Sequence, residues 1–400
     1  MDPAHDEPRY AWVVVWACFV ALAVIFGVSY AFAAFFAPFS AEFQAQRADV
    51  SLVFGLSGLI YFLLGAGAGM LADRYGPRVV TGSGMVLIGA GLLASSWATS
   101  LNQVTLAYGV GLGVGIGLVY APSIGCVQPW FQRRRGLAAG LASAGIGAGT
   151  LVVPLLAAWA IDMLQWRMAL RLLAVGVLTV GLGATLLLRR APAATAGLAR
   201  PVSGHTLREA LRSPRWRWLF AMTLLGAPAM FIPFAHVSAA ARDLGITDAR
   251  AVGLVGLIGI GSLSGRFAIG ALADRIGRPV TLVMAQASLG LAFLCWGGAG
   301  GYAAMAVFAL WMGISYGGIV SLLPALCMDF FGARAVASII GALYTGAALG
   351  NLAGPWLAGA VFDASGSYTA VVAGCLLLQV LATVAAWRAV RVDGAASTPS

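Results

Sequence analysis

The stretch GMLADRYGPR at residues 69–78 decides the fold, because it returns as GALADRIGRP at residues 270–279. The repeat places Asp73 and Asp274 201 residues apart in a chain of 400. Each copy follows an apolar run of about 20 residues, the length that crosses the hydrocarbon core of a bilayer as a helix. Self-similarity at this distance indicates two similar halves, each built from several membrane-spanning helices.

The composition is that of a membrane protein. Hydrophobic residues make up 60% of the chain and charged residues 10%, against roughly 25% charged residues in soluble domains. A soluble core cannot bury that much apolar surface, whereas lipid can surround it. The 53 glycines favour close packing between membrane helices.

Apolar runs long enough to span a bilayer follow one another along the chain. We expect twelve, near residues 11–39, 51–71, 79–98, 104–127, 136–160, 168–188, 218–241, 252–272, 280–297, 303–327, 336–362 and 368–387. We therefore predict an all-α membrane protein with twelve transmembrane helices in two six-helix pseudo-repeats. Its predicted parts are a cytoplasmic tail at 1–10, a bundle at 11–189, a cytoplasmic linker at 190–216, a second bundle at 217–388 and a tail at 389–400.

The arginines predict the orientation. The net charge is +10, and all 24 basic residues are arginine. They cluster in the connections on one side, while the other side has Arg47, Arg167, Arg242 and Arg250. By the positive-inside rule, both termini are then cytoplasmic. Because these clusters are short and lie between apolar runs, they indicate loops of a membrane-embedded protein, and we expect no nucleic-acid partner. We place the protein in a bacterial inner membrane.

The repeated stretch resembles the signature of the major facilitator superfamily between its second and third helices, and the resemblance covers essentially the whole chain. In that family the loop belongs to the alternating-access machinery. A carboxylate at a helix C-terminus is unfavourable unless it is paired. We therefore expect a gating role for Asp73, Arg74, Asp274 and Arg275; the alternative is an ordinary capped turn.

A second stretch, WFQRRRGLAAG at residues 130–140, leads into AGIGAG at residues 144–149. It resembles a stretch of the monocarboxylate transporter family and its oxalate/formate relatives. An arginine cluster that anchors a glycine-packed helix explains the same residues. They indicate the family without implying contact with substrate.

Arg266 is the deepest charged residue in the predicted spans. It lies eight residues before Asp274 and sixteen after Arg250, or about 12 and 24 Å along a helix. Its planar fork of donors suits a carboxylate, and monocarboxylate transporters carry an arginine at this place in helix eight. A structural arginine bonded to backbone carbonyls is the alternative.

Other polar side chains in the spans are candidates for the same substrate-binding site. His236 is the only histidine within a predicted span and would titrate near neutral pH; a packing histidine near the surface is the alternative. Tyr120, Tyr30, Tyr344 and Asn351 complete the candidate set, although any one such residue is more often an interhelical packing residue than a ligand.

Two positions depart from the family pattern. An acidic residue often stands one turn before the arginine of helix eight, where this chain has Ser262; a lysine often follows the first-helix motif, where it has Ala34. No acidic residue lies in the middle of a predicted span, so His236 remains the candidate proton carrier.

These observations together predict a secondary active transporter of small organic anions. We expect proton-coupled monocarboxylate transport by alternating access, by a protein that functions as a monomer in the lipid bilayer. The alternatives are an anion exchanger of the oxalate/formate type and a transporter-like receptor that moves nothing. We find no motif of an enzyme, a metal site or a cofactor.

Overall fold

The computed structural model describes residues 8–131, 134–191 and 204–392. Its first half holds α1 (Arg9–Tyr30), α2 (Phe32–Glu42), α3 (Arg47–Tyr75), α4 (Pro77–Ser96), α5 (Leu101–Val104), α6 (Gly111–Val127), α7 (Arg135–Gly176) and α8 (Leu182–Leu186). Its second half holds α9 (Leu207–Arg212), α10 (Pro214–Asp243), α11 (Asp248–Ile276), α12 (Arg278–Gly297), α13 (Tyr302–Phe331), α14 (Val336–Ser365) and α15 (Thr369–Arg391). Short π-helical stretches, Thr105–Val110 and Val177–Gly181, continue α5 into α6 and α7 into α8.

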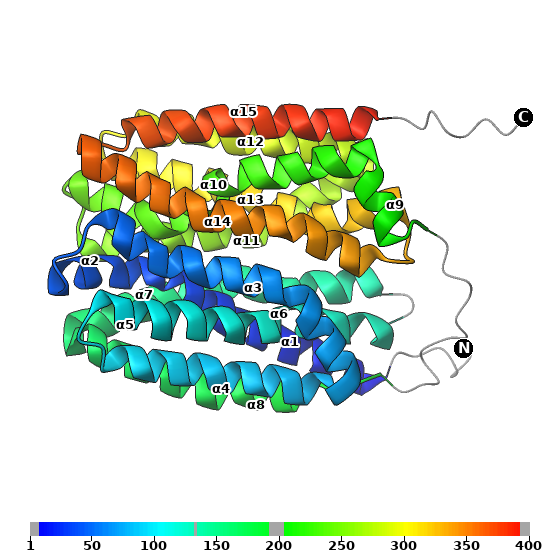
Figure 1. The fold of residues 1–400 in the computed structure, drawn as a ribbon, viewed down its shortest axis with the longest axis horizontal. Helices are drawn as coiled ribbons and strands as arrows, with labels where there is room; N and C mark the ends of the chain where they lie inside the picture. The colour runs from blue at the N-terminus through cyan, green and yellow to red at the C-terminus, as the bar shows by residue number, and fades with distance from the viewer. Residues whose placement is uncertain (1–7, 132–133, 192–203, 393–400) are drawn as a thin grey trace, which may run out of the picture.

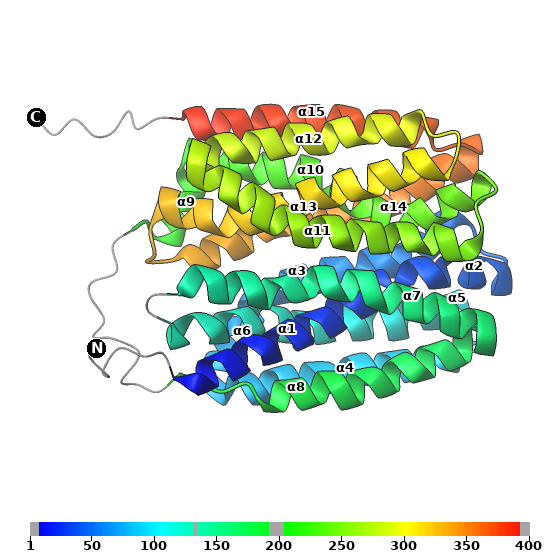
Figure 2. The same ribbon diagram turned by 180° about the vertical axis from the view of Figure 1, so that it is seen from behind.

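The long helices form two bundles that lie side by side with their axes roughly parallel (Figure 1). Helices α1–α8 make one bundle and α10–α15 the other, as the reverse view also shows (Figure 2). We call the end where α1 begins and α15 ends the terminal face, and the other end, where α3 begins at Arg47, the opposite face. The short helix α9 lies at the terminal face (Figure 1).

The helices confirm the predicted number of spans. Eleven helices within the described residues are long and apolar enough to cross a membrane, and one of them, Leu137–Leu186, is 50 residues long. At 1.5 Å per residue that helix would measure about 75 Å, more than twice the roughly 30 Å of a bilayer core. Gln165 interrupts it with φ 68° and ψ 159°, so it makes two spans and the total is twelve.

The repeated motif folds the same way in both halves. Gly76 ends α3 with φ 93° and Gly277 ends α11 with φ 92°, a backbone conformation that glycine adopts most easily. A proline follows within the first two residues of the next helix, where its missing N–H costs no hydrogen bond. The sequence repeat is therefore a repeated helix–turn–helix.

The connection between the halves carries a short capped helix. The Glu209 backbone N–H donates to Thr206 Oγ1, and the Thr206 backbone N–H donates to Glu209 Oε2 over 2.7 Å, which is a capping box. The hydrogen bond from Thr206 N–H holds the pKa of Glu209 below its usual range. Residues 192–203 of the predicted linker, 1–7 and 393–400 of the predicted tails, and Gln132 and Arg133 of the second motif lie outside the described residues.

The two bundles touch most closely toward the opposite face. A methyl group on Gly359 of α14 would stand 2.5 Å from the Ala48 nitrogen of α3, and one on Gly259 of α11 would stand 2.6 Å from the Leu151 nitrogen of α7. Toward the terminal face, a methyl group on Gly69 of α3 would have no described atom within 4 Å. Close approach of the two backbones is therefore found near the opposite face, at Gly359 and Gly259, and is not found at Gly69.

Candidate functional site

A cavity lies between the two bundles and is walled mainly by aromatic side chains. The empty space between its walls, counted together with the part that opens to solvent, is about 660 Å³. Both halves contribute to its wall, among them Phe26, Phe62, Tyr120, Phe231, Tyr316 and Tyr344. None of the described residues that line it is charged. Such a cavity accommodates an apolar body and offers phenolic hydroxyls for orientation.

Arg266 lies in α11 behind this wall. It is 7% exposed, and its Nε and Nη2 atoms have no hydrogen-bond partner among the described residues. Electrostatic interactions link its guanidinium to Tyr316, Tyr120, Tyr30 and Tyr344. One turn earlier, the buried Ser262 hydroxyl also lacks a partner among these residues. Unsatisfied buried donors of this kind are costly, and they suit an anionic ligand.

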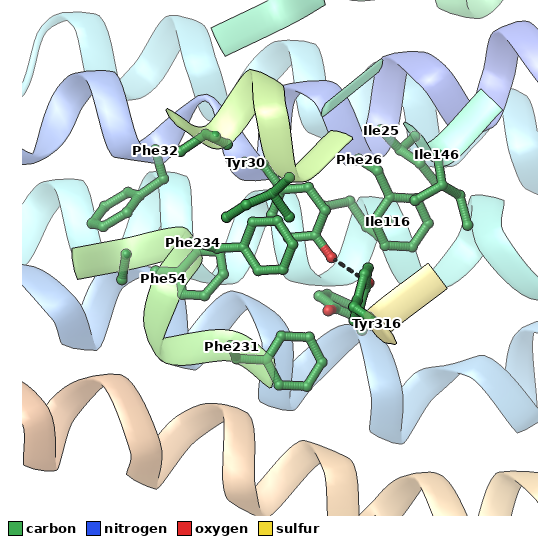
Figure 3. Close-up of a cluster of buried hydrophobic side chains, with 14 of the residues drawn as sticks. Ile25, Phe26, Tyr30, Phe32, Phe54, Ile116, Ile146, Phe231, Phe234 and Tyr316 are labelled. Atoms are coloured by element: carbon green, nitrogen blue, oxygen red, sulfur yellow. Dashed lines mark hydrogen bonds between the residues drawn. The ribbon is translucent and has the colours of Figure 1, made fainter. Parts of the chain in front are cut away.

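An aromatic layer separates the cavity from the opposite face. The hydroxyls of Tyr30 and Tyr316 lie 3.0 Å apart and join α1 to α13 (Figure 3). The Tyr30 ring stacks on Phe234 of α10, with centroids 3.9 Å apart. Tyr30 thus packs beside Tyr316 but, unlike Tyr316, is not one of the residues that line the cavity.

Beyond that layer, polar contacts join the two bundles at the opposite face. Arg47 donates to both oxygens of Asp243, over 2.7 and 2.8 Å, and to the hydroxyl of Tyr368 over 2.9 Å. The Asp363 carboxylate accepts from the backbone N–H groups of Arg47 and Ala48, over 3.1 and 2.9 Å. We call Arg47, Asp243, Asp363 and Tyr368 the opposite-face latch.

His236 lies directly beneath the latch and outside the cavity wall. It is fully buried, and its Nε2 lies 2.8 Å from the Pro355 carbonyl oxygen and 3.0 Å from Ser51 Oγ. Its Nδ1 lies 2.9 Å from the Tyr368 hydroxyl. Because a carbonyl can only accept, Nε2 carries a proton, and neutral His236 accepts from Tyr368 at Nδ1. The ring is thereby satisfied without substrate.

Asn351 occupies the contact between α14 and α3. Its Nδ2 donates to the Gly55 carbonyl over 3.4 Å, and a methyl group on Gly58 would collide with the same amide. The structure therefore brings Arg266 together with Tyr120, Tyr30 and Tyr344, and it places Asn351 and His236 elsewhere along the interface between the bundles.

The predicted gating residues stand at the terminal face. Asp73 and Arg74 lie in the last turn of α3, and Asp274 and Arg275 in the last turn of α11. Within the described part of the chain, neither carboxylate forms an ion pair. Arg190 donates to the backbone carbonyls of Ala72 and Asp73 instead.

Sequence reasoning missed the latch and two buried amides. Arg47 and Asp243 are 196 residues apart, and the internal repeat does not relate them, so no local pattern pairs them. Gln286 and Gln379 did carry a signal, because an amide within an apolar span is costly unless it is bonded. Both side chains are fully buried.

Known proteins resemble this chain over nearly its whole length. The family model described as Major Facilitator Superfamily matches residues 17–355. Monocarboxylate transporter 13 of Bos taurus is 32% identical, over 92% of this chain and 87% of the relative. MFS-type transporter opdF of Penicillium oxalicum is 29% identical, over 97% and 92%.

A solved structure shares the fold. It is a bacterial homolog of the human lysosomal transporter Spinster, in an inward-facing and unoccupied conformation. It aligns with a TM-score of 0.68 over 96% of this chain and 97% of its own, at 15% identity.

Proposed function

Because the chain belongs to the major facilitator superfamily, it is a multi-pass secondary transporter, and we propose that its substrate is a small monocarboxylate. The relatives named monocarboxylate transporters support this substrate class. We further propose that the terminal face is cytoplasmic, since the arginine clusters lie there.

The observation that carries the proposal is the pair of Arg266 guanidinium nitrogens, Nε and Nη2, that have no hydrogen-bond partner among the described residues. An arginine near the middle of a membrane costs roughly 2.5–3.5 kcal/mol on insertion scales. Its free Nε and Nη2 atoms are adjacent donors of the planar fork, and they match the two oxygens of a carboxylate. The neighbouring tyrosine hydroxyls would then orient the bound anion.

The arrangement of the bundles supports alternating access. The latch and the aromatic layer close the path to the opposite face, whereas no close approach of the two backbones is found at Gly69 toward the terminal face. Rocking of one bundle against the other would break the latch and expose the same site to the other side. We propose that Asp73 and Asp274 act in this movement, away from the substrate.

Anion exchange is a second candidate, and one observation favours it. Ser262 stands where an acidic proton carrier is common in the family, and no acidic side chain lines the cavity among the described residues. In anion exchange, a second anion binds and returns the transporter to its starting conformation, so no acidic proton carrier is needed. A receptor that binds without transport would give binding but no flux.

Uptake of labelled short monocarboxylates into proteoliposomes tests the proposal. Arg266→Lys keeps the charge but loses the fork, so we expect affinity to fall about 10- to 150-fold, as for the loss of a charge-assisted hydrogen bond of about 1.5–3 kcal/mol. Arg171→Lys is the matched control, because Arg171 donates to Ser96 inside the first bundle. Wild-type affinity in Arg266→Lys would remove Arg266 from the site.

A further inference from the structure

Two buried amides meet where the cavity reaches into the second bundle. Gln286 of α12 lines the cavity, and Gln379 of α15 lies behind it. Gln379 Nε2 donates to the Gln286 backbone carbonyl over 2.9 Å and also to Gln286 Oε1. Both side chains are 0% exposed.

This pairing leaves a buried donor of a cavity-lining residue without a partner among the described residues. Gln286 Nε2 and Gln379 Oε1 have no hydrogen bond within the described residues. The bond to the Gln286 carbonyl fixes the Gln379 amide, because the opposite orientation would set two oxygens against each other. Gln286 must then point Oε1 toward Gln379, so its NH₂ group stays available.

An interhelical clamp between α12 and α15 explains only half of this arrangement. A contact that only holds α12 and α15 together needs the hydrogen bonds between the two glutamines. It does not explain why Gln286 Nε2, a buried donor, lies beside a cavity. Leaving such a donor unsatisfied costs free energy that a methionine of similar length would avoid. An occupant of the cavity that accepts a hydrogen bond accounts for Gln286 Nε2, while Gln379 Oε1 behind it stays without a partner among the described residues.

We propose that Gln286 forms a second subsite, which binds an uncharged oxygen on the body of the transported monocarboxylate. This inference rests on the proposed function. The second group is neutral because the described lining holds no charge to balance another carboxylate. The wall contributed by Phe26, Phe62 and Phe231 suits an aromatic or branched body. The substrate class is a hydroxy- or oxo-substituted monocarboxylate with an apolar frame.

Matched pairs of ligands test the subsite. The probes are phenylacetate and 3-phenylpropanoate, each compared with its 4-hydroxy derivative, and 4-methylpentanoate compared with its 2-oxo derivative. Binding is measured by thermal stabilisation of the purified full chain, and uptake is measured in proteoliposomes. We expect at least one oxygenated ligand to bind about five- to tenfold more tightly than its partner.

The variants separate a subsite from a clamp. Gln286→Met should abolish the preference by weakening binding of the oxygenated ligand alone. A clamp predicts that Gln286→Met and Gln379→Met lower thermal stability equally and leave every preference unchanged, and that result would overturn the subsite. Absence of any preference in the wild type would overturn it too. If no carboxylate of the panel binds or enters, the proposed function itself fails.

Discussion

At the scale of single residues, two ionisable side chains buried in the spans have opposite surroundings. His236 meets a carbonyl and two hydroxyls, whereas Nε and Nη2 of Arg266 meet no partner among the described atoms. A buried polar group that is already satisfied stabilises the conformation in which it is observed, and one that is unsatisfied favours binding of a ligand. The two residues therefore serve different steps of transport.

The position of His236 gives a test of proton coupling. A proton added at Nδ1 would displace the hydrogen bond from Tyr368 and add charge beside Arg47, although Asp243 and Asp363 lie nearby. We expect acid at the opposite face to favour opening there, and uptake to respond to an imposed pH gradient. His236→Gln, which stays neutral, should flatten that response. If uptake responds to the pH gradient equally in His236→Gln and the wild type, His236 does not couple transport to protons.

The depth of Arg266 was predictable from sequence, because its distance from the nearest charged residues depends only on helical rise. The surroundings of His236 and Asn351 were not. Their partners Tyr368 and Gly55 are 132 and 296 residues away. Which residues of distant helices meet depends on packing between the bundles, and the composition of one helix does not reveal it.

At the scale of elements, the sequence predicted the twelve spans and the repeated turn well. Hydropathy and the glycine–proline turn are local properties, so they can be read from a short segment. The junction of the fifth and sixth spans was less visible. Only Gln165 leaves the helical conformation there, whereas the sequence indicated a connection of several residues after residue 160.

The crossing of α7 and α11 should be sensitive to a single methyl group. Gly259→Ala would place a Cβ 2.6 Å from the Leu151 nitrogen and 2.8 Å from the Gly147 oxygen. Overpacking of this kind costs about 1–3 kcal/mol and acts only while the bundles touch. We expect spin-label distances across the opposite face to lengthen.

Gly253→Ala on the same helix is the control, because its Cβ would meet nothing described within 4 Å. This substitution should leave the spin-label distances unchanged and stabilise helix α11 by up to about 1 kcal/mol. Equal effects of the two substitutions would show that helix propensity, and not contact between bundles, controls the distances.

The turn between α3 and α4 should affect the rate of transport rather than affinity. Asp73 forms no ion pair with the residues that the structure describes, and we expect it to gain a partner in another state of the cycle. Asp73→Asn would weaken that state by about 0.3–2 kcal/mol if a helix N-terminus is the partner. We expect slower turnover with unchanged equilibrium binding. Lost binding with normal turnover would contradict a gating role.

At the scale of the whole molecule, the two faces differ in the contacts that join the two bundles. One ion pair, hydrogen bonds and packing join the bundles at the opposite face, while the acidic residues of the repeated turn form no ion pair with described residues at the terminal face. Sequence could not predict which face is closed, because both states share the same helices. A few contacts between the bundles decide the balance.

Breaking the latch should shift that balance. Arg47→Gln leaves Asp243 without its partner, and we expect a loss of about 1–2 kcal/mol, or roughly a 5- to 30-fold change in the population closed at the opposite face. Thiol labelling of a cysteine introduced beneath the latch measures it. Arg167→Gln is the control, since its bond to Glu42 over 2.8 Å stays within the first bundle. Equal labelling in both variants would exclude the latch as a gate.

The contact of Asp363 with α3 has a consequence for secondary structure. No side chain of its own segment caps the start of α3, so the carboxylate that satisfies Arg47 N–H and Ala48 N–H comes from the other bundle. When the bundles part at this face, those amides lose their acceptor and the first turn of α3 should fray. Amide hydrogen exchange at the start of α3 would then report the transport state of an unlabelled protein.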